Sequence, residues 1–89
     1  MSLIEMEKVL ISVLTFYAGY QYKAINPKDV ESSLIKGAFS DPLVKSTMQW
    51  IKNYQLLRYS KEKVANSNHS NAESLKRILI NIVNERGAR

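Results

Sequence analysis

The segment SDPLVKSTMQWIKNYQLLRYSKEKV, residues 40–64, decides the fold. Its apolar side chains recur every three or four residues, which is the spacing of one face of an α-helix. That face consists of Val44, Thr47, Met48, Trp50, Ile51, Tyr54, Leu57 and Val64. The same spacing places Lys45, Gln49, Lys52 and Asn53 on the opposite, solvent side. We therefore predict a helix over residues 42–65 with Trp50, Tyr54 and Leu57 in the core, and an alternative in which residues 55–59 form a short strand.

Signals for the start and end of helices surround this segment. Ser2 and Glu5 have the spacing of a capping box, and Asn26 precedes Pro27, a residue suited to the first helical position. Gly37 suits the left-handed conformation that often ends a helix. Before the segment itself, Ser40 or Asp41 is a capping residue, and Phe39 has the position of a hydrophobic staple on Val44. These signals predict helices over residues 3–20 and 27–36.

Two further patterns complete the fold prediction. Residues 66–71 are all Asn, Ser or His and predict a loop. Ser70 and Glu73 then form a second capping box, ahead of an apolar stripe that predicts a helix over residues 71–86: Leu75, Ile78, Leu79, Ile82 and Val83.

The predicted helix over residues 3–20 is polar along one narrow stripe: Glu5, Lys8, Ser12, Thr15 and Gly19. It should therefore lie centrally in the fold, although its β-branched residues leave a strand as the alternative. The sequence predicts one all-α domain over residues 1–89, a compact four-helix fold in which the second and third helices resemble a helix-turn-helix pair.

Composition and motifs exclude several classes of protein. The chain has no Cys, which rules out disulfides and Cys-ligated zinc. Its one histidine, His69, lies in the predicted loop without an orienting carboxylate nearby in sequence, and no nucleotide-binding or zinc-protease motif is present. The longest apolar run, Val9–Tyr20, is far shorter than the ~20 residues that span a bilayer. We expect no enzyme activity, cofactor, metal or membrane association, and a cytoplasmic location.

The net charge of +5 is unevenly distributed. Residues 1–42 carry −1 and residues 43–89 carry +6, which favours a polyanionic partner. Exposed polar and cationic side chains on the third helix suit a recognition helix. The sequence therefore predicts a nucleic-acid-binding or nucleic-acid-associated accessory protein. The candidate contacts are Lys45, Gln49, Lys52 and Arg58, with Lys76 and Arg77 as phosphate support.

Several alternatives remain open at the sequence level. If the positive charge serves solubility alone, the alternative prediction is a protein-interaction module, such as an inhibitor, adaptor or assembly subunit. The first and last helices are rich in apolar residues, so we expect a homodimer formed through one of them. Tyr17, Tyr20 and Tyr22 with Lys23 either stack on bases or, as we favour, close the end of the core with their hydroxyls in water. Arg86 and Arg89 either grip phosphates or complement the helix dipole.

A short part of the chain resembles a known family. Ser40, Asp41 and Pro42, followed by Ile51, Tyr54, Leu56 and Arg58, resemble the segment at and after the hairpin turn of type III secretion needle subunits. The resemblance covers less than a quarter of the chain, and the apolar residues 3–20 and the polar residues 66–71 depart from that simple hairpin. It implies no function here.

Overall fold

A computed structural model describes residues 2–59 and 65–87, with the side chains of residues 65–70 and 87 left out. The described chain consists of four α-helices without a strand: α1 (Leu3–Ala18), α2 (Pro27–Lys36), α3 (Asp41–Tyr59) and α4 (Ala65–Gly87). The predicted all-α fold of four helices is confirmed. The strand alternatives for residues 3–20 and 55–59 are wrong, because residues 3–18 and 55–59 are helical.

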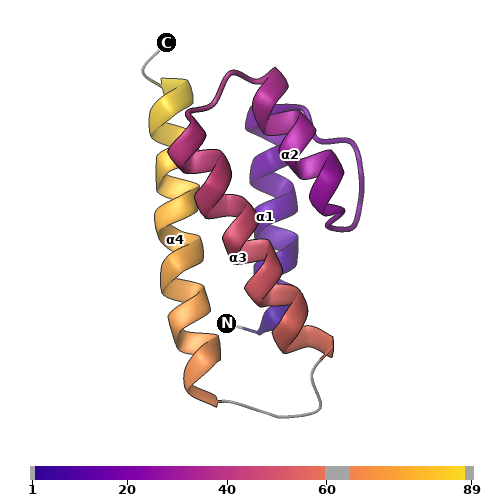
Figure 1. Ribbon diagram of the computed structural model, residues 1–89, viewed down its shortest axis with the longest axis vertical. Coiled ribbons are helices and arrows are strands. Elements are labelled where there is room, and N and C mark those ends of the chain that lie inside the picture. The colour runs from indigo at the N-terminus through magenta and orange to yellow at the C-terminus, as the bar shows by residue number, and fades with distance from the viewer. Residues whose placement is uncertain (1, 60–64, 88–89) are drawn as a thin grey trace.

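The helices form an elongated bundle in which each packs against two others (Figure 1). α3 packs against α2 and α4, and α1 packs against the same two helices. α1 and α4 run in the same direction and α3 runs opposite to both. α2 is a short helix beside one end of the bundle. This arrangement leaves the outer sides of α3 and α4 next to one another on a common face.

The core is apolar and draws on all four helices. Trp50 and Tyr54 are buried, as the helical spacing predicts, whereas Leu57 is half-buried. Lys45, Gln49, Lys52 and Asn53 are all exposed, which confirms the predicted solvent side of α3. The other buried apolar residues are Met6, Leu10, Leu14, Tyr20, Val30, Leu34, Phe39, Leu43, Val44, Ile51, Leu75, Ile78 and Ile82.

The start of α1 follows the predicted capping box, and the start of α2 follows its predicted signals in part, because Pro27 is in place and the capping hydrogen bond expected from Asn26 is not made. The Ser2 hydroxyl accepts a hydrogen bond from the Glu5 backbone N–H at 3.2 Å and donates one to the Glu5 carboxylate. Pro27 occupies the first turn of α2, but the Asn26 side chain makes no capping hydrogen bond. α1 ends at Ala18, two residues before the predicted end, because Gly19 adopts a left-handed conformation with a φ of 69°.

The turn between α2 and α3 corrects one prediction. α2 ends before Gly37, but Gly37 has a φ of −76° and Ala38 is the left-handed residue, with a φ of 60°. Ala38 N–H donates to Ile35 O, and Phe39 N–H donates to Leu34 O, which is a Schellman motif with alanine at the usual glycine position. Glycine is needed one residue earlier, because the Phe39 ring lies against Gly37.

The start of α4 corrects a second prediction. The loop expected at residues 66–71 is wrong, because these residues belong to α4, which begins at Ala65. The capping box of Ser70 and Glu73 is therefore wrong as well. The Asn and Ser residues of this segment have weak helix propensity, but the packing of α4 against both α1 and α3 outweighs it. Residues 60–64, predicted to continue the preceding helix, lie outside the described residues, as does Arg89.

Candidate polar groove between α3 and α4

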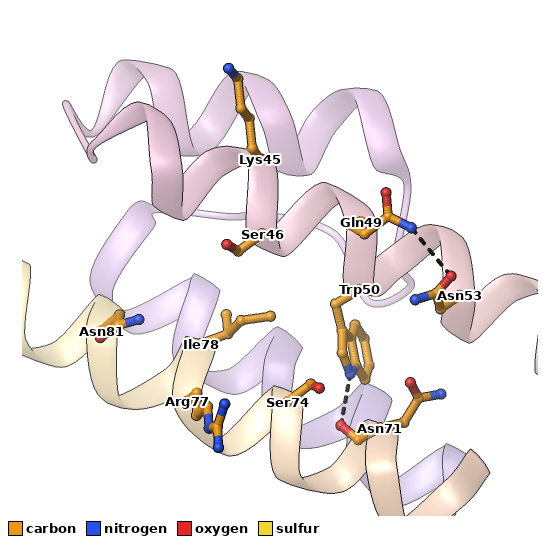
Figure 2. Close-up of a pocket in the computed structure, with 10 residues that line it drawn as sticks. All are labelled: Lys45, Ser46, Gln49, Trp50, Asn53, Asn71, Ser74, Arg77, Ile78 and Asn81. Carbon is orange, nitrogen blue, oxygen red and sulfur yellow. Dashed lines mark hydrogen bonds between the residues drawn. The ribbon is translucent and has the colours of Figure 1, made fainter.

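A groove of about 560 Å³ runs along the face where α3 and α4 meet (Figure 2). Its α3 side carries residues at three- and four-residue intervals, and its α4 side does the same, so two helical stripes face one another. The α3 residues are Lys45, Ser46, Gln49, Trp50 and Asn53, and the α4 residues are Asn71, Ser74, Arg77, Ile78 and Asn81.

Trp50 closes the inner side of the groove and joins the two helices. Its indole Nε1 donates a hydrogen bond of 2.9 Å to the Asn71 carbonyl oxygen. The Trp50 ring also stacks on Tyr54, with the ring centroids 5.3 Å apart and the planes 15° from parallel. Because this bond uses the Asn71 backbone, it leaves the Asn71 side chain free for another role.

Asn71 provides a buried donor in this groove. The residue is 8% exposed, and its side-chain Nδ2 is buried without a hydrogen-bond partner. A buried donor without a partner destabilises a fold, because it has lost its hydrogen bonds to water and gained none. Figure 2 shows this side chain at the end of the groove where Gln49 and Asn53 lie.

The electrostatic character of the groove is positive. Lys45 and Arg77 are exposed on its two sides, and among the residues that line it none is a carboxylate. The remaining polar lining consists of amides and hydroxyls, which both donate and accept hydrogen bonds. Gln49 Nε2 donates to Asn53 Oδ1 at 3.3 Å, a long bond between exposed side chains. Such a surface suits a ligand that is anionic and also carries hydrogen-bonding groups.

The structure brings three of the six predicted site residues together, namely Lys45, Gln49 and Arg77. Lys52 lines a separate shallow hollow with Gln55, Leu56 and Tyr59. Lys76 is exposed on α4 but does not line the groove.

Arg58 is engaged within the fold. Its Nη1 lies 2.8 Å from Glu7 Oε2 and donates to the Tyr54 hydroxyl at 2.7 Å. The hydrogen bonds that the guanidinium donates to the Tyr54 hydroxyl and to the Glu7 carboxylate raise the pKa of Arg58 above its ordinary value. Burial raises the pKa of Tyr54, which the hydrogen bond from Arg58 partly offsets. This cluster ties α3 to α1.

Two other groups of predicted residues also have structural roles. Tyr20 is buried and its hydroxyl donates to Ala24 O at 2.6 Å and accepts from Asn26 N–H at 2.9 Å. The expectation that its hydroxyl lies in water is therefore wrong. Arg86 Nε donates to Tyr17 O at 2.8 Å, and its guanidinium lies over the Phe39 ring at 5.1 Å.

Sequence reasoning missed most of the uncharged residues of the groove. The Asn- and Ser-rich residues 66–71 predict a loop that includes Asn71, and nothing in the sequence around Ser74 or Asn81 distinguishes them from ordinary surface residues of a helix. One signal was present: Asn71, Ser74, Arg77 and Asn81 repeat at helical spacing beside the apolar stripe. That the two stripes face one another follows from the packing of α3 on α4.

Comparison with protein families, with curated proteins and with solved structures gives no match to this chain. Within residues 2–59 and 65–87, no group of three or more His, Asp or Glu side chains is placed to hold a metal ion. Over the same part of the chain, every helix is too short or too polar to cross a membrane.

Proposed function

We propose that the chain is a small nucleic-acid-binding accessory protein that uses the joint face of α3 and α4. The observation that carries the proposal is the groove in which Lys45 and Arg77 stand among amide and hydroxyl groups, with no carboxylate among its lining residues. Clustered cations gain free energy when they displace counterions from phosphates. Gln49 supplies a hydrogen-bonding contact, and Lys52 and Lys76 supply flanking positive charge.

The chemistry of this face favours a nucleic acid over a protein ligand. Protein interfaces are usually centred on exposed aromatic anchors, and the two aromatic residues nearest the groove, Trp50 and Tyr54, are buried. Nucleic-acid interfaces are more polar and more positively charged. We assign Arg58 a smaller part than the sequence suggests, because its guanidinium is already bound to Glu7 and Tyr54.

The test is the binding of fluorescently labelled single-stranded and duplex DNA and RNA, measured by anisotropy between 50 and 300 mM salt. We expect binding at low salt that weakens as salt rises, because phosphate contacts release counterions. The double variant Lys45→Glu/Arg77→Glu should weaken binding by at least tenfold. Its matched control is Lys8→Glu/Lys23→Glu, which makes the same change in net charge around a different hollow.

Two results would contradict the proposal. One is the absence of binding to any of the four nucleic acids at the lowest salt. The other is an equal loss of affinity in both double variants, because net charge rather than the α3–α4 face would then account for binding.

A second candidate function rests on exposed apolar side chains. Phe16 on α1 is 79% exposed and Ile80 on α4 is 54% exposed, and such residues mark interaction surfaces when they lie together. As the alternative, we propose a protein-interaction module. Within either function, we propose a homodimer formed through α1 or α4.

A cytoplasmic location is part of the leading proposal, because nucleic acid inside the cell is its ligand.

Sedimentation equilibrium tests the homodimer. The expected result is a dimer that becomes a monomer on Phe16→Ser if α1 forms the contact, or on Ile80→Ser if α4 forms it, because that change removes apolar surface from the contact. A monomer for the unaltered protein at 100 μM would contradict it. The module itself is tested by a pull-down: one stoichiometric protein partner that resists nuclease and moderate salt supports it over nucleic-acid binding.

A further inference from the structure

The Asn71 side chain has no structural explanation in the fold. Its backbone carbonyl accepts the hydrogen bond from Trp50, so the side chain is not needed for that contact. Its Nδ2 is buried and has no hydrogen-bond partner. A leucine has the same number and branching of side-chain heavy atoms, with larger end groups, and its burial loses no hydrogen bond to water, so the unpartnered amide donor is a cost that leucine does not carry.

Nδ2 has almost no exposed surface as the side chain lies, so a ligand that accepts a hydrogen bond would satisfy this donor once the Asn71 amide turns about its Cβ–Cγ bond toward the groove. The groove that Asn71 lines has a volume of about 560 Å³, and its polar side chains come from both helices (Figure 2). Gln49 and Asn53, which lie at the same end, are joined to one another by a single long hydrogen bond between exposed side chains. An exposed bond of this kind exchanges with water at little cost. These two amides are therefore free to turn toward an entering group.

We infer that this end of the groove is a seat for one unpaired base of a single-stranded nucleic acid, with Asn71 Nδ2 donating to a ring carbonyl or ring nitrogen of the base. The inference rests on the proposed function and specifies its ligand. Lys45 and Arg77, on the two sides of the groove, hold the flanking phosphates. Amide side chains are the groups that read base edges by paired hydrogen bonds.

A duplex fits this seat poorly. Specific contacts to single strands use base edges that are free of their pairing partner, and a buried amide is reached by a base that leaves the stack. Unstacking and unpairing a base from a duplex costs free energy that a single strand does not incur. The site should therefore bind single strands more tightly than duplexes of the same length and charge per strand.

The experiment compares Asn71→Leu with Asn84→Leu, the same substitution at an exposed position on α4 outside the groove. For single-stranded DNA and RNA, Asn71→Leu should lower affinity about tenfold, and Asn84→Leu less than twofold. Heparin, which carries negative charge without bases, should bind both variants like the unaltered protein. Thermal unfolding of Asn71→Leu should occur at the same or a higher temperature, since the variant removes an unsatisfied buried donor.

Each outcome separates this inference from the proposed function. If the unaltered protein binds single strands but Asn71→Leu binds them equally well, the base seat is wrong and the proposed function stands. If Asn71→Leu weakens heparin as much as single strands, or if poly-glutamate binds as tightly as a single strand and with the same dependence on Asn71, the base seat is also wrong. Should Asn71→Leu fail to fold by circular dichroism, Asn71→Ala gives the same comparison.

Discussion

Glycine and alanine have exchanged their usual roles in the turn between α2 and α3. Ala38 holds the left-handed position that favours glycine, and Gly37 has an ordinary helical conformation. Glycine is required at position 37 by the limited space around its Cα and not by its φ. A Cβ at Gly37 would lie 2.8 Å from Phe39 Cε2 and 3.2 Å from Arg86 Nη2. Phe39 is buried, so its ring has little room to move.

We therefore predict that Gly37→Ala lowers the free energy of unfolding by roughly 1 to 3 kcal/mol, the usual cost of overpacking. Urea denaturation followed by circular dichroism measures it. The control is Ala38→Gly, which relieves a left-handed alanine and should raise stability or leave it unchanged to within about 1 kcal/mol. Equal destabilisation by both changes would show that the turn, and not the contact with Phe39, limits stability.

A second prediction at the residue scale concerns Tyr20 and the dependence of stability on pH. Burial raises the pKa of its phenol above the ordinary tyrosine value, so the folded state holds this proton more tightly than the unfolded state does. The stability that follows is fully present below about pH 10, the value for an unfolded tyrosine, and is lost as pH rises through the higher folded pKa.

The measurement is the free energy of unfolding between pH 8 and pH 11. Tyr20→Phe should be less stable at pH 8 by roughly 1 to 3 kcal/mol, because Asn26 N–H loses its acceptor. Its decline toward pH 11 should nevertheless be shallower than that of the unaltered protein. Parallel curves would mean that Tyr20 does not contribute to the alkaline loss of stability.

Each helix as an element shows how far periodicity predicts burial. In α4, Leu75, Ile78 and Ile82 of the predicted apolar stripe are buried, whereas Leu79 is half-buried and Val83 is 39% exposed. The start of α4 at Ala65 differs from the predicted start at residue 71. The apolar stripe can be predicted from the sequence because the residues that pack in the core recur at helical spacing. The start cannot, because tertiary contacts outweigh the weak helix propensity of Asn and Ser.

Two isoleucines of α4 test how the burial of a side chain determines its contribution to stability. Ile82 is 0% exposed and Ile80 is 54% exposed, although they lie two residues apart. We expect Ile82→Ala to cost about 2 to 5 kcal/mol through the cavity it leaves, and Ile80→Ala to change stability by less than about 0.5 kcal/mol. Chemical denaturation of both variants gives the comparison. Similar losses would mean that Ile80 is covered in solution, as a dimer through α4 requires.

The whole molecule is held together by contacts that close a ring of helices. Besides the shared core, Arg58 joins α3 to α1, and Ser40 at the start of α3 donates from its backbone N–H and its hydroxyl to the Glu85 carboxylate of α4. Trp50 adds a third link, from α3 to α4. Since every helix depends on two neighbours, separating one helix exposes the core of the others.

We therefore predict a single cooperative unfolding transition. Trp50 fluorescence, which reports the contact of α3 with α4, and far-ultraviolet circular dichroism, which reports all helices, should have coincident midpoints in urea. Calorimetry should give a heat-capacity change of about 1.2 kcal/mol/K, from ~13 cal/mol/K for each residue. A Trp50 transition at lower urea would show that α4 separates before the other helices unfold.

The sequence by itself determined the all-α fold, the inward direction of Trp50 and Tyr54 and the outward direction of Lys45, Gln49 and Lys52, because these depend on local helical spacing. Tertiary structure alone decided that Arg77 shares a groove with Lys45, that Arg58 is bound by Glu7, and that Asn71 Nδ2 is buried without a hydrogen-bond partner. The physical reason is that spacing along one helix sets which residues share its face, while the packing of one helix on another sets which faces meet.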